Sequence, residues 1–260
     1  MRRTRTKSSS FSLPDFAEPP VETTPFAAPQ SRQSTSAALA IFARAPVPGR
    51  AKTRLIALLG EAGAAQFQCA LLGDSLGKVR PFHTGAALYL FLAGSTSGLG
   101  GLVKIPTQVE VALQNGSTLG DRLESAFRKL FKHHQRAVIT GTDSPLLPPA
   151  TLRLALHELR TCDAVLGPCP DGGYYLIGLR ASRSQPILRG LLREVRWSTR
   201  FAFRDTLGSI TRRGLSCSVL PEWNDVDRPA DVLRLRRWLH RHATARRLAP
   251  QTWRFLKTFL

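Results

Sequence analysis

The feature that most constrains the fold is an unbroken apolar run at 38–43, Ala-Leu-Ala-Ile-Phe-Ala, which leads directly into a basic loop containing two prolines and a glycine. A strand that is apolar at every position is typical of the centre of a parallel sheet, where both faces are buried. Apolar runs at 86–92 and 137–140 alternate with helical patterns at 60–79 and 119–131. This alternation predicts a three-layer α/β/α domain with a mainly parallel sheet.

The remaining elements follow from the same patterns. We expect strands at 109–113, 163–166, 174–179 and 216–220, and helices at 149–160, 201–212 and from 229 to about 240. Hydroxyl side chains at Ser117 or Thr118, and at Ser198 or Thr199, are expected to cap the helices that follow them.

The chain divides into a tail and one domain. Residues 1–36 are rich in Ser, Thr, Pro and Arg and lack apolar periodicity, which predicts a disordered tail before a domain at 37–258. No apolar run is long enough for a bilayer span or for the core of a signal peptide, so we expect a cytoplasmic protein. The four cysteines form no C-x-x-C pair, which favours reduced structural thiols over a zinc site.

The net charge of +19 raises the possibility of a nucleic-acid partner. However, 30 of the 37 basic residues are arginine, which resembles a codon preference more than a selected surface. Nine of the 37 basic residues, eight arginines and one lysine, lie in 228–260 with a single aspartate. A basic binding module with a decayed enzyme site therefore stays an alternative, although we expect no specific nucleic acid. A basic surface also concentrates anionic ligands such as nucleoside diphosphates.

Four cations cluster in the loop that follows the first strand: Arg44, Arg50, Lys52 and Arg54. Ligands of open α/β sheets bind outside the carboxyl ends of strands, and such a loop can hold a diphosphate with backbone N–H groups and side-chain cations. The glycine spacing excludes a Walker A loop. The competing interpretation is a solvated basic loop, and in either case we expect Lys52 to be exposed.

Two acidic segments are candidate metal ligands. Asp143, in Gly-Thr-Asp-Ser-Pro, follows the strand at 137–140, where a carboxylate can hold Mg²⁺ or Mn²⁺ against phosphate oxygens. Asp227, the second aspartate of Asp-Val-Asp at 225–227, would supply a second carboxylate to the same ion. The competing interpretation is that each aspartate caps the helix that follows it.

A turn at 170–175, Pro-Asp-Gly-Gly-Tyr-Tyr, joins two expected strands and predicts a hairpin. The alternative is functional: paired glycines allow a substrate to approach the backbone closely, and Tyr174 offers a stacking face or a hydroxyl. No G-x-S-x-G sequence is present, which disfavours an α/β serine hydrolase.

Taken in order, the segments at 42–55, 141–145, 166–179, 197–199 and 225–231 resemble the DUF2064 family. Its members are named as bacterial glycosyltransferases and are similar to the phospholactate and molybdenum-cofactor guanylyltransferases, which have a Rossmann-like GT-A fold. The resemblance covers about 38–255. It implies catalytic roles for Lys52, Asp143 and Asp227, with Mg²⁺ or Mn²⁺ on the two aspartates.

The resemblance also implies where each substrate binds. The nucleotide would contact Arg44, Pro46, Gly49, Arg50, Lys52, Thr53 and Arg54, and the acceptor side would comprise Asp171, Gly172, Gly173 and Tyr174. One departure concerns substrate choice, because family members commonly have Gly-Asp where this chain has Ser117-Thr118.

The implied activity is a transferase with a nucleotide-activated donor. We expect a glycosyltransferase that uses a nucleotide sugar and a divalent metal, and a guanylyltransferase-like nucleotidyltransferase is the alternative. The acceptor would be a small molecule that the sequence does not identify.

Overall fold

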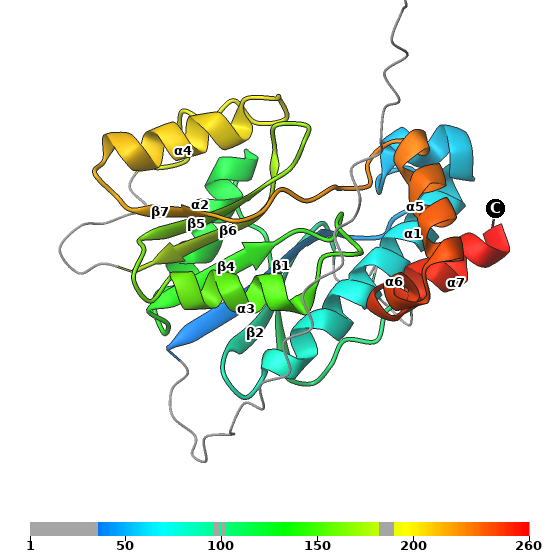
Figure 1. Ribbon diagram of the computed structural model, residues 1–260, viewed down its shortest axis with the longest axis horizontal. Helices are drawn as coiled ribbons and strands as arrows, with labels where there is room; N and C mark the ends of the chain where they lie inside the picture. Colours follow the sequence, from blue (N-terminus) through cyan, green and yellow to red (C-terminus); the bar gives the residue numbers. More distant parts are fainter. Residues whose placement is uncertain (1–35, 96–98, 100–101, 182–189, 260) are drawn as a thin grey trace, which may run out of the picture.

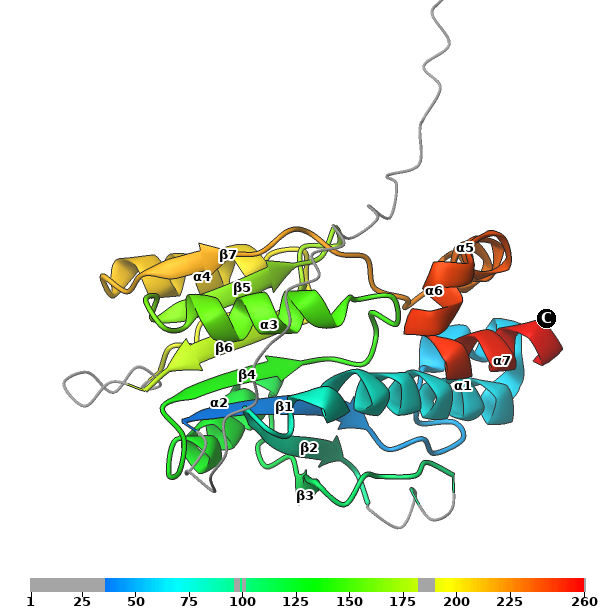
Figure 2. The same cartoon turned by 60° about the horizontal axis from the view of Figure 1, so that its bottom comes forward.

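The computed structural model describes residues 36–95, 99, 102–181 and 190–259, so the predicted tail lies outside it except for Ser36. A seven-stranded sheet has the order β3-β2-β1-β4-β6-β5-β7 (Figures 1 and 2). Its strands are β1 (Ala37–Arg44), β2 (Ala87–Ala93), β3 (Val109–Leu113), β4 (Arg136–Thr140), β5 (Ala164–Pro168), β6 (Tyr174–Arg180) and β7 (Cys217–Val219). β6 pairs antiparallel with β4 and β5 and the other pairs are parallel, which confirms a mainly parallel sheet.

The central strand β1 shows why the apolar run must be continuous. Leu39 and Ile41 belong to the core on one face of the sheet, whereas Ala38 and Ala40 belong to the core on the other face. All four are fully buried, so a polar residue at any of them would lose its hydration without gaining a partner.

Helices cover both faces of the sheet (Figures 1 and 2). Side chains of α1 (Ile56–Val79) and α3 (Pro149–Glu158) complete one core, and those of α2 (Leu119–Leu130) and α4 (Ala202–Arg212) complete the other. Two 3₁₀ turns, η1 (Thr53–Leu55) and η2 (Arg80–Phe82), flank α1. The three-layer prediction is therefore confirmed.

The C-terminal part differs from the expectation of one helix ending near residue 240. It forms three helices, α5 (Pro229–Arg241), α6 (Ala243–Leu248) and α7 (Pro250–Phe259), which pack on the side of α1 that faces away from the sheet (Figure 2). The prediction missed α6 and α7, and α6 has only six residues. The single buried residue of α6 is Ala245, which leaves almost no apolar periodicity.

Helix α1 has buried apolar residues on two faces because it is covered on two sides. Leu72 and Leu76 face the sheet, while Phe67 and Leu71 face the C-terminal helices. The segment Thr53–Phe82 is long and apolar enough to cross a membrane by length and composition, although 56% of its most apolar stretch is buried inside the fold. Packing between two layers accounts for that composition.

Three local predictions have different outcomes. Thr118 caps α2, and its hydroxyl accepts the Asp121 N–H at 3.1 Å. Cys169 and Gly173 close the predicted hairpin turn between β5 and β6, since the Cys169 N–H donates to the Gly173 carbonyl. At α4 the cap residue is Phe201, and Thr199 contributes by accepting the Phe201 N–H.

Candidate functional site

A pocket of about 340 Å³ opens where the loops after β1 and β4 leave the same edge of the sheet. β1 and β4 are parallel neighbours, so their carboxyl ends meet there, and β2 continues the sheet from the other side of β1. This arrangement places the pocket beside a point where strand order reverses, the usual ligand position in open α/β sheets. Its lining comprises Phe42, Arg44, Arg50, Lys52, Thr53, Arg54, Gln68, Gly141, Thr142, Asp143 and Asp227.

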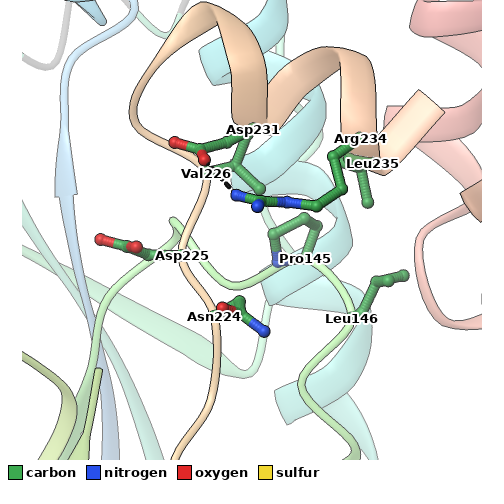
Figure 3. A pocket seen from close by; sticks show the side chains of 8 residues that line it. All are labelled: Pro145, Leu146, Asn224, Asp225, Val226, Asp231, Arg234 and Leu235. Atoms are coloured by element: carbon green, nitrogen blue, oxygen red, sulfur yellow. Dashed lines mark hydrogen bonds and ion pairs between the residues drawn. The ribbon is translucent and has the colours of Figure 1, made fainter. Parts of the chain in front are cut away.

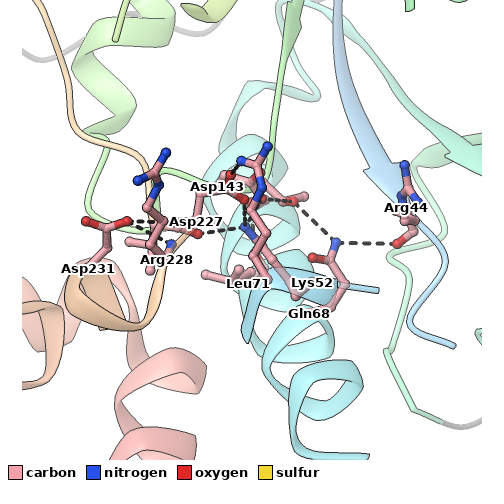
Figure 4. A network of polar contacts seen from close by, with 12 residues as sticks. Arg44, Lys52, Gln68, Leu71, Asp143, Asp227, Arg228 and Asp231 are labelled. Atoms are coloured by element: carbon pink, nitrogen blue, oxygen red, sulfur yellow. Dashed lines mark hydrogen bonds and ion pairs between the residues drawn. The ribbon is translucent and has the colours of Figure 1, made fainter. Parts of the chain in front are cut away.

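Lys52 is the centre of the polar network in this pocket (Figure 4). Its ammonium donates to the Val226 carbonyl at 2.7 Å, forms an ion pair with Asp143 Oδ1 at 2.9 Å, and lies 3.7 Å from Asp227 Oδ1. The expectation of an exposed Lys52 is wrong, because its side chain is only 5% exposed. Two carboxylates and a carbonyl replace the water that an ammonium would otherwise need.

The backbone of Lys52 explains how the loop turns its side chain inward. Lys52 has φ 47° and ψ 45°, a left-handed conformation that costs a non-glycine residue about 1–2 kcal/mol. Gly49, three residues earlier, also has a positive φ of 74°. The loop therefore contains two sharp reversals, and the contacts of Lys52 offset the strain at its own position.

Neither candidate metal aspartate caps a helix. Helix α3 begins after Pro148 without a side-chain cap, and at α5 it is Asp231 that accepts the N–H groups of Asp227 and Arg228. Asp227 forms an ion pair with Arg54 in addition to its contact with Lys52. The structure thus brings Asp143 and Asp227 to one ammonium, with side chains 45% and 32% exposed.

Gln68 is a site residue that our sequence reasoning missed. It lies on α1, is 3% exposed, and donates to the Arg44 carbonyl and to the Thr142 hydroxyl, both at 3.3 Å. Thr142 in turn donates to Asp143 Oδ1 at 3.1 Å. The available signal was an amide among the apolar residues around 67–72 of this helix, since a buried amide requires polar partners.

The remaining loop predictions divide into two groups. Arg44, Arg50, Thr53 and Arg54 line the pocket, whereas Pro46 and Gly49 are not among its lining residues. A Cβ at Gly49 would approach the Glu61 carboxylate at 3.3 Å, so this glycine has a role in folding the loop.

The residues expected on the acceptor side lie outside the pocket lining. Gly172 has φ 85°, and a Cβ there would lie 2.1 Å from the Arg200 carbonyl oxygen, so packing within the chain already requires glycine. The ring of Tyr174 packs against Trp197 at 6.1 Å between centroids. Asp171 is exposed, and Gly173 N–H donates to its Oδ1 at 2.8 Å.

A second acidic cluster lies beside the pocket and includes Asp171. Ligand atoms of Cys169, Asp171 and Asp225 all lie within 4.8 Å of one another, close enough to hold a metal ion. Burial, followed by repulsion from Asp171, Asp143 and Asp227, raises the pKa of Asp225 to about 6. Burial also raises the pKa of the Cys169 thiol, and the nearby carboxylates add to this effect. Sequence spacing gave no indication of Cys169 as part of this site.

A family model described as "Uncharacterized protein conserved in bacteria (DUF2064)" matches residues 81–199. A crystal structure from Desulfovibrio desulfuricans G20, provisionally designated a nucleotide-diphospho-sugar transferase, is 30% identical to the chain, with a TM-score of 0.76 over 86% of this chain and 94% of that one. The chain belongs to the DUF2064 family. A search of curated proteins found no match.

More distant structures share the fold of this DUF2064 protein. A CMP:2-keto-3-deoxy-manno-octonic acid synthetase bound to CTP is 12% identical, with a TM-score of 0.50 over 79% of this chain and 99% of that one. The manganese complex of Rv0371c from Mycobacterium tuberculosis H37Rv is 18% identical, with a TM-score of 0.50 over 77% and 97% of the two chains. These structures confirm the GT-A-like fold, and the likeness to the Desulfovibrio desulfuricans structure supports an enzyme of the transferase class.

Proposed function

We propose that this DUF2064 protein is a glycosyltransferase that binds the diphosphate of a nucleotide sugar in the pocket between the β1 and β4 loops. The observation that carries the proposal is the composition of that pocket, which combines Arg44, Arg50 and Arg54 with Lys52 and Asp143. Guanidinium groups bind phosphate oxygens in a bidentate manner, and cations beside a departing diphosphate stabilise the charge that develops on it.

The carboxylates at the pocket fit a divalent ion. Asp143 and Asp227 are partly exposed and supply oxygen atoms, the ligands that Mg²⁺ and Mn²⁺ prefer. Such an ion would neutralise the diphosphate of the donor. The manganese complex of a protein with this fold supports the proposal. In this structure the Lys52 ammonium contacts both carboxylates, so it would share them with the ion.

The chain's own residues then have separable roles. Arg44 and Arg50 would orient the donor phosphates, while Lys52 would hold Asp143 in position and donate to a phosphate oxygen. Gln68 fixes the β1 loop relative to the β4 loop, because its amide reaches Arg44 and Thr142 together. The acceptor hydroxyl would attack the anomeric carbon of the sugar, and the nucleoside diphosphate would leave with the bonding electrons.

Nucleotidyl transfer is the second candidate. A structure of the same fold holds CTP, and in that chemistry an acceptor phosphate or hydroxyl attacks the α-phosphorus and releases pyrophosphate. The same residues would bind the nucleoside triphosphate. The leaving group therefore distinguishes the two reactions.

An activity panel tests the proposal. The protein is incubated with Mg²⁺ or Mn²⁺, candidate acceptors, and either nucleoside triphosphates or nucleotide sugars, and the release of pyrophosphate or nucleoside diphosphate is measured. Asp143→Asn should lower turnover by at least about 100-fold, because it removes charge that organises the transition state. Glu194→Gln, which changes a carboxylate that is 82% exposed and outside the pocket lining, should not. Equal turnover by Asp143→Asn and wild type would contradict this assignment.

A further inference from the structure

The cluster of Cys169, Asp171 and Asp225 combines one thiol with two carboxylates that are far apart in sequence. The turn between β5 and β6 carries Cys169 and Asp171, and the segment before α5 carries Asp225. That segment is hydrogen-bonded on both sides, since Trp223 N–H donates to the Pro168 carbonyl and Val226 N–H donates to the Asp143 carbonyl. Asp225 is therefore held between the β5–β6 turn and the β4 loop.

Neither carboxylate has a basic partner within the part of the chain that the structure describes. Among the residues that the structure describes, no lysine, arginine or histidine forms an ion pair with Asp171 or Asp225. Arg234 of α5 instead pairs with Asp231, and Asp225 points away from it (Figure 3). This is unexpected in a chain with 37 basic and only 18 acidic residues. The cluster thus concentrates negative charge that no described side chain neutralises.

The Cys169 thiol is an independent indication of a ligand. It is 6% exposed, its Sγ lies within 4.8 Å of both carboxylates, and it donates no hydrogen bond to any described residue. Gly173 N–H donates to Oδ1 of Asp171, and no described residue donates a hydrogen bond to the other carboxylate oxygen. The cluster therefore offers one sulfur and at least two oxygens, with access from the exposed side of Asp171.

We propose that Cys169, Asp171 and Asp225 bind a divalent cation with affinity for sulfur, of the Zn²⁺ class. Zinc is bound about 2.3 Å from thiolate sulfur and about 2.0–2.2 Å from carboxylate oxygen, so small rotations of the side chains would bring these atoms into range. A thiolate ligand disfavours Mg²⁺, which distinguishes this site from the oxygen ligands Asp143 and Asp227. Ion binding would release the thiol proton to solvent.

Three protein ligands leave a coordination position for a substrate oxygen, as in zinc sites that act in catalysis. If the proposed transferase function holds, on which this step alone rests, that oxygen would be the hydroxyl or phosphate of the acceptor. Cation binding itself does not depend on the transferase function and is tested without nucleotide.

Metal titration of the full-length, metal-free protein tests the site. Co²⁺ serves as a spectroscopic probe, because a thiolate ligand produces a sulfur-to-cobalt absorption band, and Zn²⁺ affinity is measured by competition with a chelator. The wild type should show the band and bind one Zn²⁺ at this site. Cys169→Ser should lose the band and weaken Zn²⁺ binding by at least about tenfold, since even residues that only support metal ligands change affinity by 10- to 100-fold. Mn²⁺ binding should be unchanged.

Two further variants provide controls. Cys217→Ser changes a half-buried thiol of β7 and should keep the band. Asp171→Asn changes an exposed residue and can still accept the Gly173 N–H, so it should fold and yet bind Zn²⁺ more weakly. The absence of a thiolate band in the wild type, or its persistence in Cys169→Ser, would overturn the proposal. Zn²⁺ binding without nucleotide binding would contradict only the proposed transferase function. Nucleotide binding without Zn²⁺ binding would contradict only the proposed zinc site.

Discussion

At the scale of single residues, the position of Lys52 is set by a conflict between its backbone and its side chain. The backbone is in a left-handed conformation that disfavours a Cβ, whereas the buried ammonium contacts Asp143, Asp227 and the Val226 carbonyl. A strained residue that persists at a ligand pocket indicates that its surroundings require that conformation.

Two substitutions separate the two effects. Lys52→Ala keeps the backbone strain and removes the ammonium, so Asp143 and Asp227 would lose the charge they share. Lys52→Gly removes the ammonium and also relieves the left-handed strain. We expect the free energy of unfolding to be higher for Lys52→Gly than for Lys52→Ala by about 1 kcal/mol. Urea unfolding of both variants measures this difference, and a less stable glycine variant would show that the loop lacks this conformation in solution.

The sequence alone located most of the pocket but not the environment of its residues. Arg44, Arg54, Asp143 and Asp227 were predictable because each follows an apolar strand or precedes a helix, and ligands gather at such ends. The burial of Lys52 could not be predicted, because it depends on carboxylates 91 and 175 residues further along the chain. Cys169 was missed for the same reason, since its neighbour Asp225 comes from another element.

At the scale of elements, α1 connects the C-terminal helices to the pocket. Asp74 accepts the N–H groups of Gln251 and Thr252 at 2.9 and 2.8 Å, and so caps the start of α7 from a neighbouring helix. One turn later on α1, the buried Lys78 donates to the Pro145 carbonyl, two residues after Asp143. A single face of α1 thus holds both α7 and the β4 loop.

The buried Lys78 predicts a dependence of stability on pH. Burial lowers its pKa to about 8, although the charge of Asp74 opposes this shift, whereas an unfolded chain has a lysine pKa near 10.4. Between about pH 8 and 10 the unfolded chain binds more protons than the folded one, so the contribution of this group to stability rises with pH. The free energy of unfolding of wild type minus that of Lys78→Met should increase by up to roughly 3 kcal/mol across this window.

Urea unfolding at a series of pH values measures this difference. The exposed Lys132 provides the matched control, because Lys132→Met should give a difference that hardly changes over the same range. A flat profile for Lys78→Met would show that Lys78 has an ordinary pKa in the folded protein.

The element predictions succeeded where one pattern extended over a whole element. Strands β1 and β4 are apolar except at their ends because both faces of the sheet are covered, and α2 has one clear apolar face. Helices α6 and α7 were missed; α6 has only six residues and packs on α5 and α7, whereas α7 packs mainly on α1. The start of α1 was also misplaced, since Gly60 has a non-helical φ of 68° and interrupts the pattern that extends back to Ile56.

At the scale of the whole molecule, the net charge of +19 is unevenly distributed. Several arginines converge on the pocket, whereas the carboxylates Asp171 and Asp225 beside it have no basic partner among the described residues. This separation of charge suits a donor diphosphate on one side and a cation on the other. A general basic surface for nucleic acid would not require it.

The central claim is that the β1 loop holds a nucleotide diphosphate through Lys52 and its neighbouring arginines. Isothermal titration with GTP and with UDP-glucose, each with Mg²⁺, tests it on wild type, Lys52→Ala and the control Lys132→Ala, after circular dichroism has shown that each is folded. A charge-assisted contact to phosphate contributes about 1.5–3 kcal/mol, so Lys52→Ala should bind about 10- to 150-fold more weakly than wild type. Lys132→Ala should bind like wild type. Equal affinities for wild type and Lys52→Ala would contradict the account.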